Sequence, residues 1–156
     1  MNRTTGEIAD FTVHSSVSAA RGLWFRGGGF TTMGYAAHQA LADADLSVSA
    51  YKLFHQMCAI QNRKDHGLVI VESQVKFAEQ VGMAQSSVSR SLKQLADAGF
   101  IYPDGRNWRI RPDFAFNGNG AAQGQAVQNI PAGTPDPYAP KGAQLTVIDG
   151  GDDSDG

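Results

Sequence analysis

The sequence is short of large apolar side chains and holds a single cysteine, and both shortages restrict what the protein can be. Leu, Ile, Val and Phe together occupy 33 of the 156 positions, which is close to the lower limit at which chains bury enough surface to fold. Cys58 is the one cysteine, so an internal disulfide and a multi-cysteine zinc site are both excluded. A lone cysteine is typical of the reducing cytoplasm, where we expect this chain to act.

Long apolar runs are also missing. The longest aliphatic run is Leu68–Val71, far shorter than the roughly 20 apolar residues that a membrane-spanning helix needs. No apolar block follows Arg3 near the N-terminus, so this segment does not resemble a secretory signal. We therefore expect no membrane partner.

The large apolar side chains and the charges that are present are unevenly distributed. Residues 46–116 hold 20 of the 33 large apolar side chains and carry a net charge of +3. Residues 1–45 carry −1 and residues 117–156 carry −4, within a total of −2. This pattern predicts one modest, mildly basic core, and such an asymmetry favours a polyanionic partner for the centre of the chain.

Composition divides the chain into three parts. Residues 1–29 are polar and end in three glycines, so we expect a flexible N-terminal arm. Residues 30–116 are the predicted folded domain. Residues 117–156 contain eight Gly and four Pro without a periodic apolar face, which predicts a disordered acidic tail. Within it, the short apolar patch at 143–148 is either a docking peptide or inert tail.

Two elements are expected ahead of the centre. Residues 23–26 are compatible with a short strand. Residues 30–42 are compatible with a helix that places Met33, Ala37 and Leu41 on one face.

The centre of the chain predicts the order helix, strand, helix, helix, strand, strand. Ser47 is a suitable N-cap for the first helix, whose buried face would comprise Ala50, Leu53, Phe54, Met57 and Cys58. Residues 68–71 are β-branched and short, as in a strand. Ser73 would cap the second helix and Gly82 would end it, with an inner face of Val75, Phe77, Ala78 and Val81.

The third helix is expected from about Ala84 to Ala98, and its buried positions would be Val88, Leu92 and Leu95. Strands at 100–102 and 108–110 would follow, joined by a hairpin turn at 103–107 that contains Pro-Asp-Gly. The fold class is therefore mainly α with a small β-hairpin (α+β).

The second and third helices are separated by only two or three residues, so they must pack at a steep angle. Ala78 is small where the helices cross, Gly82 suits a turn with positive φ, and Val88 points into the angle between them. This spacing predicts a helix-turn-helix, which presents one helix to a DNA major groove.

The outward face of the third helix consists of hydrogen-bonding side chains and lacks carboxylates. Gln pairs with adenine, Arg with guanine, and Ser with a base edge or a phosphate. The simpler alternative is an amphipathic core helix that happens to lack acids. On the DNA interpretation the outward residues of this helix are Gln85, Ser86, Ser89, Arg90, Lys93 and Gln94.

The hairpin and the second helix supply the remaining candidate contacts. Arg106, Arg109 and Arg111 recur through the turn and the last strand, as in a wing that contacts phosphates or a minor groove. Alone they would also suit a basic edge strand that discourages aggregation. At the start of the second helix, Ser73 and Gln74 would offer backbone N–H groups to a phosphate.

Two stretches resemble known families. Residues 81–101, VGMAQSSVSRSLKQLADAGFI, are similar to the winged helix-turn-helix of bacterial transcriptional regulators of the MarR and Crp type. Residues 105–118, GRNWRIRPDFAFNG, are similar to the RepL-type plasmid replication proteins. The resemblance implies a winged helix whose reading positions correspond to Ala84, Gln85, Ser86, Ser89 and Arg90. It also implies a role in transcription regulation or plasmid replication.

Enzyme chemistry finds little support, and we expect neither a catalytic site nor a cofactor. The four His residues have no partner at helical spacing, so no local metal-binding motif appears. The alternative to a DNA binder is a winged helix used for protein assembly, which would expose Leu, Phe or Met on the third helix. The sequence favours a sequence-specific double-stranded DNA-binding protein. We expect a homodimer, joined through residues 24–41, that contacts half-sites about 10 bp apart.

Overall fold

The computed structural model describes residues 25–139, and the chain divides after Phe30 into two units that are considered separately. In the first unit, the described residues 25–30 contain a turn in which the Gly28 N–H donates to the Phe25 carbonyl at 3.1 Å. The prediction of a strand over residues 23–26 is wrong for its second half, which lies in this turn. Its first half and the rest of the predicted arm lie outside the described residues.

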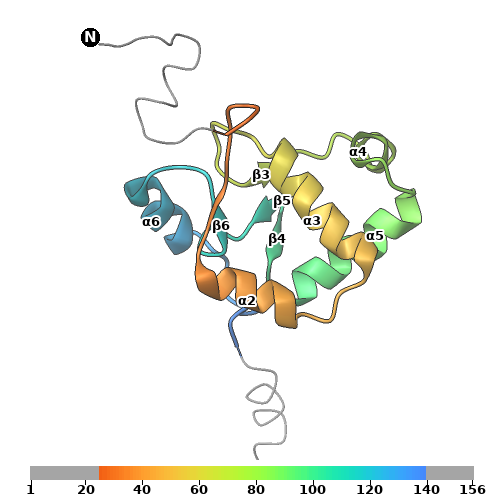
Figure 1. Cartoon of the computed structure of the whole chain (residues 1–156). Coiled ribbons are helices and arrows are strands. Elements are labelled where there is room, and N and C mark those ends of the chain that lie inside the picture. Colours follow the sequence, from red (N-terminus) through yellow and green to blue (C-terminus); the bar gives the residue numbers. More distant parts are fainter. Residues whose placement is uncertain (1–24, 140–156) are drawn as a thin grey trace, which may run out of the picture. The chain divides into compact units, whose positions relative to one another are not determined.

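The second unit is an α+β fold with five helices and two small antiparallel sheets among its described residues (Figure 1). The helices are α2 (Tyr35–Asp43), α3 (Val48–Ile60), α4 (Gln74–Val81), α5 (Gln85–Asp97) and α6 (Gly120–Gln128). The strands are β2 (Thr32–Met33), β3 (Leu68–Val69), β4 (Ile101–Asp104), β5 (Asn107–Ile110) and β6 (Ala115–Phe116). One sheet has the order β3-β5-β4 and the other pairs β2 with β6. No helix of the described part is long and apolar enough to cross a membrane.

Local capping signals set the ends of the central helices. The Ser47 hydroxyl accepts a hydrogen bond from the Ala50 N–H at 3.1 Å, at the start of α3. The Ser73 hydroxyl accepts one from the Lys76 N–H at 3.1 Å, at the start of α4. These bonds satisfy backbone donors that a helix leaves without an internal partner. Both predicted N-caps are confirmed.

The β4–β5 hairpin is longer than its sequence pattern predicted. Pro103 pairs with Trp108 and Asp104 pairs with Asn107, which leaves a two-residue loop. Gly105 in this loop has φ +65°, a value that tight hairpin loops demand and glycine adopts readily. β3 pairs with the other side of β5, so β5 is the central strand.

The core gathers around α3 and three phenyl rings. The rings of Phe100 and Phe114 stack with centroids 4.5 Å apart, and Phe54 meets Phe114 edge-on at 5.7 Å. The predicted inner face of α3 is confirmed except that Cys58 is only half-buried. On α4 the prediction for Val75 is wrong, because its side chain is 55% exposed. The buried side of this eight-residue helix is narrow and comprises Phe77, Ala78 and Val81.

The N-terminal helix begins later than predicted. α2 starts at Tyr35 instead of Phe30 because Thr32 and Met33 pair with Phe116 and Ala115 in the small sheet. On the predicted face Ala37 is buried, whereas Met33 and Leu41 are half-buried.

Residues 117–139 differ most from the sequence prediction. Disorder beginning at residue 117 is wrong as far as residue 139, since this segment contains α6 and then packs, through Tyr138, against the core of the second unit. Asn119 caps α6 by accepting from the Ala122 N–H at 2.8 Å. The Tyr138 hydroxyl donates to the Asp113 carbonyl at 2.7 Å. A helix cap and side-chain hydrogen bonds hold this segment in place without an apolar helix face. Residues 140–156 lie outside the described part.

Candidate nucleic-acid interface

A tight turn joins α4 to α5 and sets the angle between them. Gly82 has φ +69°, and the Met83 N–H donates to the Ala78 carbonyl at 3.0 Å. In Figure 1, α4 is seen nearly end-on whereas α5 runs across the picture, so their axes are steeply inclined. Ala78 and Val88 are both buried at this crossing. The local features predicted for these three positions are therefore confirmed.

α5 divides cleanly into a buried and an exposed face. The buried side chains include the predicted Val88, Leu92 and Leu95, together with Ser91. All the predicted contacts around α5 are exposed: Ala84, Gln85, Ser86, Ser89, Arg90 and Lys93. Positions 85, 86, 89, 90 and 93 recur at helical spacing, so they share one face.

Charge on this face is positive and only partly compensated. The first carboxylate in α5 is Asp97 at its last position, and it pairs with the Lys93 ammonium at 3.2 Å. That pair is largely exposed, so solvent screens it. Arg90 makes no hydrogen bond or ion pair with any residue among 25–139. Its side chain is exposed, so within this part of the chain the guanidinium is open to an external acceptor.

The hairpin tip lies beside the start of α4. An Arg106 guanidinium nitrogen donates to the Glu72 carbonyl at 2.9 Å, and the Val71 N–H donates to the Asn107 side-chain oxygen at 2.9 Å. Ser73 and Gln74 are exposed next to this contact. The structure thus brings Arg106 together with the predicted anion-binding end of α4.

Arg109 lies apart from this group and is fully engaged by carboxylates. Its guanidinium is within 2.9 Å of Asp65 and 2.8 Å of Asp104, and it also donates to the His66 carbonyl. The Arg109 hydrogen bond holds the pKa of Asp65 below its usual value. Because the side chain is only 18% exposed and doubly paired, we withdraw the expected phosphate contact of Arg109.

Arg111 has a comparable internal role. Its guanidinium pairs with Asp113 at 2.6 Å and donates to the Pro135 carbonyl at 2.9 Å. Only 13% of its side chain is exposed. The expected phosphate contact of Arg111 is therefore withdrawn as well, and its observed contacts join the end of β5 to the C-terminal segment.

Two side chains differ in role from what the sequence suggested. Gln94 was expected to point outward with the DNA-facing residues, but its side-chain oxygen accepts from the Ser47 N–H at 2.9 Å. This bond joins α5 to the start of α3. Lys76 was not singled out, although it is an exposed cation in the first turn of α4, paired with Glu72 at 3.0 Å. The position of Lys76, three residues after the predicted N-cap Ser73, was the sequence feature that could have identified it.

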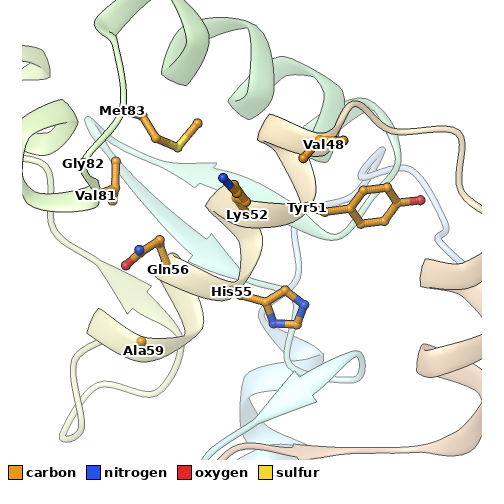
Figure 2. A pocket seen from close by; sticks show the side chains of 9 residues that line it. All are labelled: Val48, Tyr51, Lys52, His55, Gln56, Ala59, Val81, Gly82 and Met83. Carbon is orange, nitrogen blue, oxygen red and sulfur yellow. The ribbon is translucent and has the colours of Figure 1, made fainter.

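A shallow groove of about 630 Å³ lies between α3 and the α4–α5 turn. In Figure 2, Lys52 and Gln56 extend from α3 toward the side of Met83, while the Tyr51 ring points away from it. No carboxylate lines the groove, whose residues are Val48, Tyr51, Lys52, His55, Gln56, Ala59, Val81, Gly82 and Met83. No pattern in the sequence predicted this groove.

The cysteine is not a reactive group in this structure. Burial raises the pKa of the Cys58 thiol to about 12, so little thiolate is present at neutral pH. Among residues 25–139, no group of three or more His, Cys, Asp or Glu side chains is placed to hold a metal ion.

Comparison with protein-family models, with curated proteins and with solved structures finds no match for this chain. Function is therefore inferred from the geometry and charge of α4, α5 and the β4–β5 hairpin.

Proposed function

We propose that this chain is a sequence-specific double-stranded DNA-binding protein whose second unit is a winged helix-turn-helix. In this proposal α4 and α5 are the two helices of the motif, and the β4–β5 hairpin is the wing. α5 enters the major groove, as the second helix of such motifs does. Transcription regulation or plasmid replication would be the biological role.

The exposed face of α5 is the observation that carries the proposal. Over positions 85–93 it presents amide, hydroxyl and cationic groups, with no carboxylate until Asp97. Its buried face is fixed by packing, so the exposed groups are held on a rigid element. Gln85 and Arg90 are suited to adenine and guanine edges, and the serines to a base or a phosphate.

The surroundings of α5 supply contacts to the DNA backbone. Arg106 at the hairpin tip and Lys76 on α4 are exposed cations near the start of α4. In this proposal, the backbone N–H groups at the N-terminal end of α4, beside Ser73 and Gln74, would bind a phosphate. Such contacts position a protein on the duplex without reading its sequence.

A homodimer on two half-sites about 10 bp apart is the arrangement we propose. Residues 24–41 remain the candidate interface; Trp24 lies outside the described residues. Within α2, the Tyr35 side chain is 96% exposed, which is available area for a partner subunit. The alternative, a winged helix used for protein assembly, lacks exposed Leu, Phe or Met on α5.

The test is duplex binding by the full chain and by Arg90→Ala, measured by fluorescence anisotropy after selection of preferred duplexes from a random pool. We expect Arg90→Ala to weaken binding to the preferred duplex by about 1–3 kcal/mol and to relax the preference at one position. Arg63→Ala is the matched control, because Arg63 is an exposed cation on the loop before β3.

Unchanged binding by Arg90→Ala would remove α5 as the reading helix. Equal losses for Arg90→Ala and Arg63→Ala would indicate attraction by net charge alone. Absence of binding to any duplex at low salt would refute the proposed function and favour the assembly alternative.

A further inference from the structure

The exposed face of α5 and the end of the sequence carry opposite charge. The face and its neighbours present the cations Lys76, Arg90, Lys93 and Arg106. Lys76 and Lys93 have carboxylate partners in Glu72 and Asp97, but these pairs are largely exposed and therefore screened by solvent. Residues 149–155 contain four aspartates and no cation: Asp149, Asp152, Asp153 and Asp155. This composition resembles the dense negative charge of a phosphate backbone, which is the ligand proposed above for the same face.

The described chain ends beside the C-terminal end of α5. Gly99 lies two residues beyond α5, and a Cβ placed on it would be 2.3 Å from the Pro135 carbonyl oxygen. Pro135 is also held by Arg111, and Tyr138 is anchored on Asp113. The starting point of residues 140–156 is therefore fixed relative to α5.

From this point the aspartates can reach the whole exposed face. α5 has 13 residues and is therefore about 20 Å long at 1.5 Å per residue. The ten residues that follow Ala139, up to and including Asp149, span up to about 33 Å when extended. Covalent attachment over such a length gives an effective concentration on the order of millimolar, enough for weak ion pairs to form.

We propose that residues 149–155 dock on the exposed face of α5 and compete there with nucleic acid, so that the chain inhibits its own binding. The competition rests on the proposed function, whereas the docking does not. The face of Arg109 is a poorer site because this side chain is only 18% exposed and is held by two carboxylates, Asp65 and Asp104. The groove along α3 is also poorer, since Lys52 and His55 are the only basic side chains among the described residues that line it.

The docking is tested by NMR of the full chain without DNA, comparing the natural sequence with D152N/D153N. We expect amide shifts on Ser86, Ser89 and Arg90 that disappear at high salt, because ion pairs are screened. The matched control is D43N/D45N, which changes net charge equally at exposed positions outside α4, α5 and the hairpin. The control should leave these three amides unchanged.

The competition is tested with the same variants and a fluorescent duplex. D152N/D153N should bind about three- to tenfold more tightly at ~50 mM salt, with a smaller gain at ~200 mM. D43N/D45N should change affinity less than about twofold, because charge is largely screened beyond about 15 Å even at the lower salt concentration.

The outcomes separate the two proposals. Shifts confined to the loop at 62–67 or to the α3 groove, or no shifts at all, would overturn the docking even if duplexes bind well. A gain in affinity without shifts on α5 would also overturn it and indicate general repulsion. Shifts on α5 in a chain that binds no duplex would support the docking and refute the DNA-binding proposal.

Discussion

Arg109 shows that the role of a charged side chain depends on its contacts with segments that are distant in the sequence. Arg109 lies on the hairpin, but Asp65 lies on the loop before β3, 44 positions earlier. Their hydrogen bond lowers the pKa of Asp65. A lowered pKa means that ionised Asp65 stabilises the folded state above its ordinary pKa, and that this contribution is lost as pH falls through the folded value.

We therefore predict that Asp65→Asn lowers the free energy of unfolding near neutral pH by less than about 1 kcal/mol, because the carboxylate is half-exposed and screened. The difference from the natural chain should shrink as the pH falls through the lowered pKa of folded Asp65. Urea unfolding at neutral pH and over a series of acidic pH values measures this. Asp45→Asn, an exposed change away from Arg109, is the control. A difference that persists in acid would contradict the ion-pair explanation.

Which residue roles were predictable depends on how far away their partners lie. Ser47, Ser73 and Gly82 act on backbone groups within four residues, so sequence spacing was enough to assign them. The exposed positions of α5 followed from its apolar period. The pairing of Arg109 and Arg111 was not predictable, because Asp65 and Pro135 reach them only through the tertiary fold.

Helices and strands were predictable where they carry an apolar period or a recognisable boundary. α3 and α4 have a period and a side-chain N-cap, α5 has a period but no side-chain N-cap, and the β4–β5 hairpin contains Pro-Asp-Gly at its turn. The predicted bounds of these elements differ from the structure by a few residues. β2 and β6 have two residues each, which is too short for any alternation to appear. α6 buries no residue fully, so it has no apolar face from which a helix is predicted.

Substitution of Gly99 tests how closely the C-terminal segment packs against the end of α5. Gly99 has φ +87°, and an added Cβ would meet the Pro135 carbonyl at 2.3 Å, whereas Gly105 has φ +65° and open space around it. Gly105→Ala should lower the free energy of unfolding by about 1 kcal/mol through backbone strain alone. Gly99→Ala should lower it by about 2–4 kcal/mol, because the C-terminal segment must also move. Equal losses in denaturant unfolding would show that Pro135 does not press on Gly99.

At the scale of the whole second unit, the packing of the C-terminal segment determines whether that segment unfolds together with the core. Residues 131–138 are poor in apolar side chains, yet Tyr138 packs on Phe114 with ring centroids 5.9 Å apart. Phe114 in turn contacts Phe54 and Phe100 at the centre of the core. A segment that composition alone assigns to disorder is therefore joined to the core by one aromatic ring and a few polar contacts.

This anchoring predicts a graded response at Tyr138. Tyr138→Phe removes only the hydrogen bond to the Asp113 carbonyl and should lower the free energy of unfolding by about 0.5–1.5 kcal/mol. Tyr138→Ala also removes the half-buried ring and should lower it by about 2–3 kcal/mol. Val48→Ala, at a side chain that is 72% exposed and lies outside the candidate dimer interface, should be near neutral. Urea unfolding gives all three values, and a neutral Tyr138→Ala would place the C-terminal segment outside the cooperative fold. It would also remove the fixed starting point from which residues 149–155 are proposed to reach α5.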